Sequence, residues 1–280
     1  MFGPTTNPAH PNVLLAAGAM AVACSLLSVF VILRRWALVG EGISHSGFGG
    51  AGTAWLAALV WPVMEQPFMP YAFAILFCLL AAVSIGWLSR RENVNTDAAI
   101  GIFLVASLAW GFLGQQVYVQ TRHTQPPGWD TFLFGQLEHL TLRDAMASVF
   151  LCAAVLLVLV AMGKELLAYC YDPTLAETGG VRGSVVHYVL MILIAITMII
   201  GMRITGSVLV PALLVLPGAA AVRLTRGLRP AFATSLVFGV VGTGLGLAAA
   251  AYWRSLPAGP SIVLALFAMF LVTLAIPRRA

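Results

Sequence analysis

Apolar runs of about 20 residues recur along the whole chain, and this repetition limits the folds that the chain can adopt. A hydrocarbon core of roughly 30 Å requires about 20 apolar residues for each helix that crosses it. The predicted spans lie near residues 13–33, 43–61, 71–89, 97–117, 143–162, 185–203, 205–222, 231–252 and 260–277. The sixth and seventh spans meet at Arg203 almost without a linker, so the alternative to nine spans is eight, with one half-span or broken helix.

The composition excludes a water-soluble fold of this size. Of the 280 residues, 60% are hydrophobic and 9% are charged, whereas about a quarter of the residues of a soluble domain are charged. In lipid the backbone groups must be satisfied by helices or by a closed barrel. Barrel strands alternate apolar and polar residues, but segments 149–160 and 262–276 are apolar at nearly every position. The sequence therefore predicts an all-α, polytopic membrane helix bundle of eight or nine transmembrane helices, organised as a single domain over residues 1–280.

The basic residues predict how this bundle is oriented, because positively charged loops are retained in the cytoplasm. If the N-terminus is outside, eleven of the fifteen Lys and Arg residues lie in inner loops, and only Arg122, Arg143, Arg203 and Arg254 lie outside. This split predicts an outer N-terminus, a cytoplasmic C-terminus and an odd number of spans. The net charge of +5 is then a signal of topology and does not indicate nucleic-acid binding.

The four cysteines are Cys24, Cys78, Cys152 and Cys170. They show no CxxC spacing, and three of them lie inside apolar runs. We expect them to be small core residues rather than disulfide partners or metal ligands.

The largest predicted cytoplasmic feature lies at about residues 163–183. Asp172 followed by Pro173 indicates a helix start, because an Asp side chain caps free N–H groups and Pro is tolerated in the first turn. Gly179 and Gly180 are expected to end this helix. The pattern predicts a short helix at about 173–178, although an ordinary loop turn would explain the same residues. A capped helix at this place would allow a membrane subunit to contact a motor subunit.

Glycine and serine cluster between residues 39 and 53, where the second predicted span begins. Small residues let helices approach closely in a membrane, so we expect this span at the centre of the bundle. Glu41 and His45 stand four residues apart and share one face of a helix, one turn from each other. A carboxylate and an imidazole at this spacing can bind one cation at roughly 2.0 to 2.2 Å. A structural alternative is equally open, in which Glu41 caps the helix and His45 bonds to a carbonyl group.

Five short segments resemble the signatures of one transporter family, and they occur in that family's order. The stretch 39–45 resembles the "GDAxSH" signature of the permease subunits of bacterial zinc, manganese and iron ABC importers. The other four are Asp97–Ile102, which resembles "DTAIGI"; Leu133–Gly135, which resembles "LFG"; Asp172–Ala176 with Gly180, which resembles "DPEFA...G"; and Leu213–Ala221, which resembles "LLIIPAATA". Together the five segments cover most of the chain.

The resemblance implies roles for two sets of residues. Glu41 and His45 match the family's metal-coordinating acidic residue and histidine. The residues that match the family's coupling helix, which docks on the ATPase subunit, are Asp172, Pro173, Leu175, Ala176 and Gly180. Glu41 replaces the usual Asp, and Gly49 replaces a Pro of the usual pattern, so the identity of the metal stays open.

The resemblance also implies a function and a set of partners. The chain would be the transmembrane permease subunit of an ATP-driven importer of divalent transition metal ions in the bacterial inner (plasma) membrane. It contains no GxxxxGK[ST] segment, so it would be a transport subunit and not an enzyme, with ATP hydrolysis on a separate cytoplasmic ATP-binding subunit. The other partners would be an extracytoplasmic metal-binding protein and a second permease, either an identical copy in a homodimer or a paralogue. No permanently bound cofactor is expected, and zinc, narrowly ahead of manganese, would be the transported substrate.

Two alternative functions use the same residues differently. A secondary metal-ion transporter or channel that is not driven by ATP would commonly place several carboxylates at mid-membrane depth, whereas no Asp or Glu lies deep in a predicted span. A membrane scaffold without a transport role would leave Glu41 and His45 unexplained. Near the outer loop, His123 and His139 are candidates for guiding metal inward, although a solvated interfacial position explains them more simply.

Overall fold

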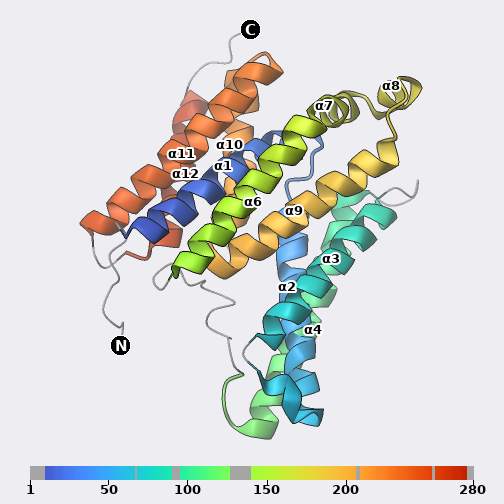
Figure 1. The fold of residues 1–280 in the computed structure, drawn as a ribbon, viewed down its shortest axis with the longest axis vertical. Helices are drawn as coiled ribbons and strands as arrows, with labels where there is room; N and C mark the ends of the chain where they lie inside the picture. The colour runs from blue at the N-terminus through green and yellow to red at the C-terminus, as the bar shows by residue number, and fades with distance from the viewer. Residues whose placement is uncertain are drawn as a thin grey trace. The chain divides into compact units, whose positions relative to one another are not determined.

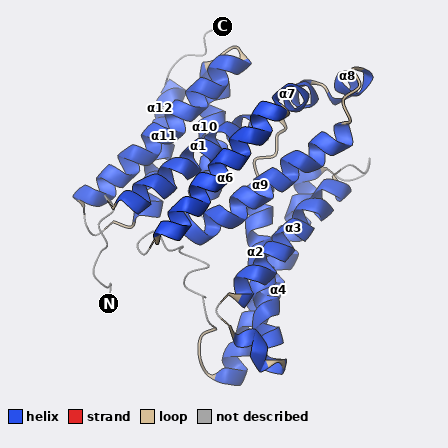
Figure 2. Ribbon diagram, viewed as in Figure 1, coloured by secondary structure: helices blue, strands red, loops and turns tan. Residues whose placement is uncertain are grey.

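The computed structural model describes residues 10–66, 68–89, 95–126, 140–205, 209–253 and 256–275. Within these ranges every regular element is a helix, as predicted (Figure 2). Each of the nine predicted spans overlaps one long α-helix: α1 (Pro11–Leu33), α2 (Val39–Val60), α3 (Met69–Leu88), α4 (Thr96–Arg122), α6 (Leu142–Ala161), α9 (Gly183–Thr205), α10 (Leu209–Leu224), α11 (Leu228–Tyr252) and α12 (Ala258–Ala275). The shorter helices are η1 (Pro62–Glu65), α7 (Gly163–Tyr171) and α8 (Pro173–Thr178).

Seven of the described helices are long and apolar enough to cross a membrane by themselves. Helix α10 is apolar but has only 16 residues. Helix α2 has 22 residues, but its Gly, Ser, Glu and His residues keep it out of this set. The structure therefore supports a multi-pass helical membrane protein, whereas the predicted count of eight or nine spans is not reached by length and composition alone.

Close packing between helices follows the small residues of α2. The chain divides into two compact units, and the second unit contains residues 38–133 and 187–199. In this unit α2 packs against both α3 and α4 (Figure 1). A Cβ atom added to Gly50 would lie 2.5 Å from the carbonyl oxygen of Phe73 in α3, and one added to Gly114 in α4 would lie 2.5 Å from that of Gly52. Within its unit, α2 therefore occupies the central position that its small residues predicted.

The first unit contains residues 1–37, 134–186 and 200–280, and α1 is the helix that connects its parts. Helix α1 packs against α6, α10 and α11. Buried serines supply polar bonds at these contacts: the Ser28 hydroxyl accepts a bond of 2.7 Å from the N–H of Gly218, and the Ser235 hydroxyl donates one of 2.6 Å to the carbonyl of Ser25. Such bonds matter in a membrane because lipid tails are as apolar as Leu side chains. The hydrophobic effect therefore does not drive the helices together, and packing and hydrogen bonds between helices do so instead.

All four cysteines are buried free thiols, which agrees with the prediction that they are core residues. Cys170 lies in α7, outside the helices that are apolar enough to span the membrane. Burial raises the pKa of the Cys170 thiol to about 12, and the nearby charge of Arg34 opposes this rise.

Cys170 should therefore be protected from thiolate-directed reagents in the folded chain. At pH 8 we expect iodoacetamide to modify Cys170 about a thousandfold more slowly in mild detergent than in denaturing detergent, because the reagent attacks the thiolate. Mass spectrometry of the peptide that contains Cys170 measures both rates. Equal rates would show that this thiol is exposed and that α7 is not packed as described.

Candidate metal site and the helix after Asp172

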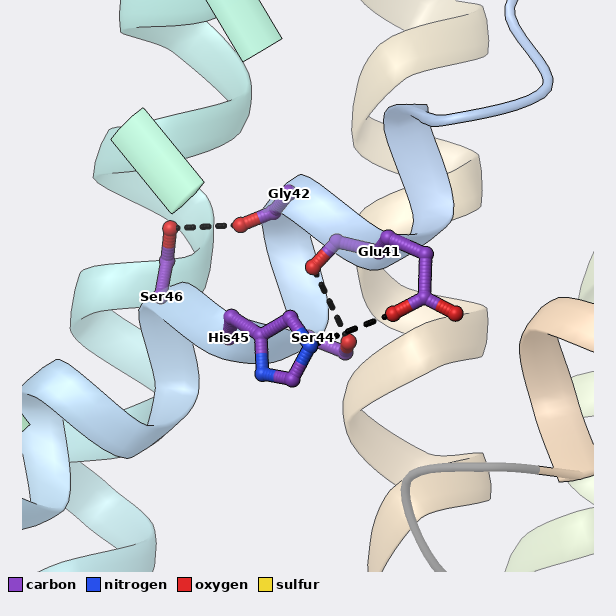
Figure 3. A network of polar contacts seen from close by, with 5 residues as sticks. All are labelled: Glu41, Gly42, Ser44, His45 and Ser46. Carbon is purple, nitrogen blue, oxygen red and sulfur yellow. Dashed lines mark hydrogen bonds and ion pairs between the residues drawn. The ribbon is translucent and has the colours of Figure 1, made fainter. Parts of the chain in front are cut away.

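The first two turns of α2 carry the candidate metal ligands. The helix starts after Leu38, and the structure, which describes this segment completely, gives its N-terminus no side-chain cap. Glu41 lies in the first turn, where the helix dipole favours a negative charge. Its side chain is directed to His45 one turn later (Figure 3). The capping alternative considered for Glu41 is therefore not what the structure contains.

The donor atoms of the pair converge. His45 Nε2 lies 3.2 Å from Glu41 Oε2. Two ligands that each bind a tetrahedral zinc ion at about 2.0 to 2.1 Å lie about 3.3 Å apart. The same separation also suits an ion pair between a carboxylate and a protonated imidazole. The separation of the two donor atoms therefore allows one cation to bind both of them.

The two side chains remain partly open, with 38% of Glu41 and 31% of His45 exposed. A charged side chain facing lipid is costly, so ionisable groups in membrane helices normally face a bundle interior or an aqueous cavity. The remaining surface of this pair is therefore expected to face a passage or another protein chain rather than lipid.

Hydrogen bonds and close contacts hold the backbone around the pair. The Ser44 hydroxyl donates to the carbonyl of Glu41 at 3.0 Å, and the Ser46 hydroxyl donates to that of Gly42 at 2.8 Å (Figure 3). From α4, the Ser107 hydroxyl donates to Ser46 at 3.3 Å. A Cβ atom on Gly42 would lie 2.7 Å from a methyl group of Ile100 in α4. These contacts fix the turn that carries both candidate ligands against α4.

The sequence did not predict the contribution of α4 to this arrangement. Ser107 and Ile100 lie in an apolar run whose composition does not reveal which face meets α2. The segment 97–102 was identified only through its resemblance to a family signature. In the structure this segment packs beside the candidate site, because Ile100 contacts Gly42, the residue that follows Glu41.

One chain supplies two candidate ligands at this place. Among the residues that the structure describes, no three His, Cys, Asp or Glu side chains are close enough to hold a metal ion together. Structural and catalytic zinc sites usually use three or four protein ligands. The pair therefore suits either a transient site that a moving ion occupies or a site completed by another chain.

Of the two histidines that the sequence suggested for guiding metal, the structure describes His123. His123 follows α4 in a left-handed conformation with φ of 56°, and its side chain is exposed. Its neighbour Arg122 forms an ion pair with Glu65 of η1 at 2.5 Å. His139 lies outside the described residues. An exposed His123 fits the simpler prediction of a solvated interfacial residue, and its part in metal uptake stays untested.

The short helix predicted after Asp172 is present as α8. The Asp172 carboxylate accepts hydrogen bonds from the N–H groups of Thr174 and Leu175, at 2.9 and 3.1 Å. Helix α8 ends at Thr178, and Gly180 follows with φ of 85°, a conformation that favours glycine. Ala176 is buried, whereas 70% of Leu175 is exposed. The cap and the closing turn thus define both ends of a short helix that carries an exposed apolar side chain.

Comparison with known proteins identifies the family. The sequence profile of the ABC 3 transport family matches residues 8–277, which is nearly the whole chain. The chain belongs to the ABC 3 transport family. This agrees with the resemblance carried by the five short segments, and it makes the chain a transport component of a membrane system rather than an enzyme.

Individual members of the family are similar over most of their length. A probable iron transport system membrane protein of Haemophilus influenzae is 30% identical over 94% of this chain and 92% of its own. The manganese import system permease protein ScaB of Streptococcus gordonii is 30% identical over 94% of this chain and 89% of its own. The manganese transport system membrane protein MntC of Halalkalibacterium halodurans is 29% identical over 92% of this chain and 83% of its own.

Solved structures give the same answer for the fold. PsaBC from Streptococcus pneumoniae, solved in complex with Fab, superposes with a TM-score of 0.76 at 28% identity, covering 96% of this chain and 92% of that chain. An inward-facing putative metal-chelate type ABC transporter superposes with a TM-score of 0.65 at 15% identity, covering 95% of this chain and 85% of that chain. The second similarity concerns the fold alone. This member of the ABC 3 transport family therefore shares its fold with both solved chains.

Proposed function

We propose that this chain is the permease subunit of an ATP-driven importer of divalent transition metal ions, and that the ion passes the Glu41 and His45 pair. The observation that carries the proposal is the 3.2 Å separation of the two donor atoms within a member of the ABC 3 transport family. Relatives named for manganese and for iron support a transition metal as substrate. These names make manganese a candidate substrate beside the zinc that the sequence narrowly favoured, and the uptake experiment below decides between the two ions.

A second permease would complete the site. Two copies that present Glu41 and His45 to each other supply four ligands, which is the number that a closed zinc site uses. The absence of a third ligand from the described part of one chain supports this arrangement. A paralogue with the same pair would serve equally well, so the proposal covers both a homodimer and a heterodimer.

The topology follows from helix length and charge. Helix α2, with 22 residues, extends about 33 Å at 1.5 Å per residue and is long enough to cross a bilayer. With α10 as a short ninth span, the odd count agrees with the distribution of Lys and Arg. The N-terminus then lies outside the bacterial inner membrane, and α8 and the C-terminus lie in the cytoplasm. An extracytoplasmic metal-binding protein delivers the ion to the outer face.

Helix α8 is the proposed contact with the ATP-binding subunit. Its rigid cap at Asp172 and its exposed Leu175 provide an apolar projection beyond the membrane helices. Apolar side chains at the centre of an interface commonly contribute most of the binding free energy. The same residues match the family's coupling helix in the sequence.

Replacing Leu175 by Asp should weaken binding of the ATPase subunit by about 30-fold, because a charge would enter an apolar contact. Copurification of the two subunits from detergent measures the effect. Leu142→Asp is the matched control, because Leu142 is a similarly exposed leucine at the far end of α6, on the predicted outer side. Equal recovery of the ATPase with wild type and Leu175→Asp would contradict the assignment of α8.

The function itself is tested by metal uptake into proteoliposomes that contain the permease and its ATPase subunit. We expect manganese or zinc uptake that requires both ATP and the ATPase, and competition between the two ions reports which one is preferred. Uptake by the permease alone, without ATP, would overturn the proposal and indicate a secondary transporter or channel.

A further inference from the structure

A stack of three side chains joins α7 to the end of α1. The guanidinium of Arg34 lies 4.5 Å from the ring centre of Tyr169 in α7 and 5.3 Å from that of Trp36. Arg34 Nη2 also donates a long hydrogen bond of 3.3 Å to Tyr169 Oη. Both rings are almost fully buried. Contacts of this kind between a cation and an aromatic ring face are strongest where water is excluded.

The stack holds Arg34 mainly through ring faces. Among the described residues no carboxylate lies within ion-pair distance of Arg34, and its Nε atom has no hydrogen-bond acceptor. The backbone favours the arrangement, because Arg35 adopts a left-handed conformation with φ of 59° and the N–H of Trp36 bonds back to Val31. The charged side chain at the end of α1 thus makes its main contacts with aromatic rings, one of which belongs to α7.

The two aromatic partners of Arg34 lie close in the sequence to two segments of the proposed function, which are α8 and the start of α2. Tyr169 lies three residues before Asp172, which is both the C-cap of α7 and the N-cap of α8, so the two helices are joined without a flexible linker. On the other side, Trp36 lies five residues before Glu41. The chain leaves the first compact unit between Ala37 and Leu38, so the stack is anchored in that unit immediately before the turn into α2.

We propose that Arg34 is a positioning residue that transmits movement of α7 and α8 to the turn that carries Glu41. The inference rests on the proposed function and adds a route by which ATP hydrolysis reaches the metal site. When the ATPase displaces α8, α7 moves with it because of the shared Asp172. The Arg34, Tyr169 and Trp36 stack then moves the start of α2, and the orientation of Glu41 changes with it.

A purely structural stack would give a different result from a transmitting one. A structural stack predicts that breaking it lowers the amount of folded protein, and that metal uptake and ATP hydrolysis fall together. A transmitting stack predicts that ATP hydrolysis continues while less metal moves for each ATP. The ratio of metal transported to ATP hydrolysed therefore separates the two.

The experiment uses the complete transporter in proteoliposomes, with the extracytoplasmic binding protein and with manganese or zinc as the probe ion. We expect Tyr169→Leu and Arg34→Met to keep ATP hydrolysis within about twofold of wild type and to lower the metal transported per ATP by about tenfold, a usual size for coupling between sites. Tyr169→Phe retains the ring and should behave like wild type. Arg34→Lys retains the cation and should recover part of the loss, because Lys stacks less well on a ring than Arg.

The matched control is Lys164→Met, which removes an exposed cation from the same helix α7. It should leave the ratio of metal to ATP unchanged. An unchanged ratio in Tyr169→Leu, or a parallel loss of uptake and hydrolysis, would overturn the transmitting role while leaving the proposed function intact. If wild type itself shows no ATP-dependent uptake, the proposed function fails, and the inference fails with it.

Discussion

Replacing His45 by Ala should reduce ATP-dependent manganese or zinc uptake by about 100-fold or more, because even supporting residues around a metal site change affinity by about 10- to 100-fold. The structure gives the reason, since His45 Nε2 is one of only two donor atoms that converge in this part of the described chain. Each permease would then present Glu41 alone, so two carboxylates would replace the four proposed ligands and should hold the ion far less tightly. Uptake into proteoliposomes measures the loss.

Two further variants separate ligand loss from misfolding. Glu41→Gln keeps the size of the side chain and removes its charge, and it should lower uptake nearly as much as His45→Ala. Glu41→Asp shortens the side chain by one methylene and should retain part of the uptake, because the family usually has Asp at this position. The control is His10→Asn, since His10 is an exposed histidine that caps α1 by accepting a hydrogen bond from the N–H of Asn12, and Asn is also a good helix cap. Wild-type uptake by His45→Ala would refute the proposed site.

Replacing Gly114 by Ala should destabilise the protein by about 1–3 kcal/mol, the usual cost of overpacking. A Cβ atom at Gly114 would lie 2.5 Å from the carbonyl oxygen of Gly52 and 2.8 Å from its Cα, and all of the nearest atoms are backbone atoms. No side-chain rotation relieves such a clash, so α4 would have to move away from α2. The midpoint of thermal unfolding in detergent should fall by several degrees.

The same helix contains its own control. A Cβ atom at Gly101 meets no atom within 4 Å, and Ala is favoured over Gly inside a helix by about 0.8 to 1.0 kcal/mol. Gly101→Ala should therefore leave the midpoint unchanged or raise it slightly. Because the two substitutions are chemically identical, equal midpoints for both variants would show that α2 and α4 are not in close contact.

Much of the helix content was predictable because membrane helices satisfy their backbone locally. Each apolar run of sufficient length coincides with a helix, including the 16-residue α10. The start of α8 was predictable for a similar reason, because Asp172 bonds to N–H groups only two and three residues away. The sequence could not decide the number of spans, because the sixth and seventh predicted spans meet almost without a linker. In the described structure, α10 has only 16 residues and α2 carries many polar and small residues, so neither qualifies as a span by length and composition.

The contacts around the candidate site were less predictable. A helix that is apolar on all sides has no polar face that indicates which neighbour it meets. The pairing of Ser107 with Ser46, and of Ile100 with Gly42, therefore depends on how α4 packs on α2. Likewise, Tyr169 is 135 positions away from Arg34, and nothing in the spacing of these residues indicates their contact.

The sequence by itself determined that this chain is a helical membrane protein and that a carboxylate and an imidazole share one helix face, because both follow from interactions within one or two turns. The tertiary structure decided that α4 supports the turn that carries Glu41 and His45, and that Arg34 meets Tyr169. The distinction has a physical cause. Local hydrogen bonding follows from the order of residues, whereas contacts between distant helices depend on how closely small residues allow the backbones to approach.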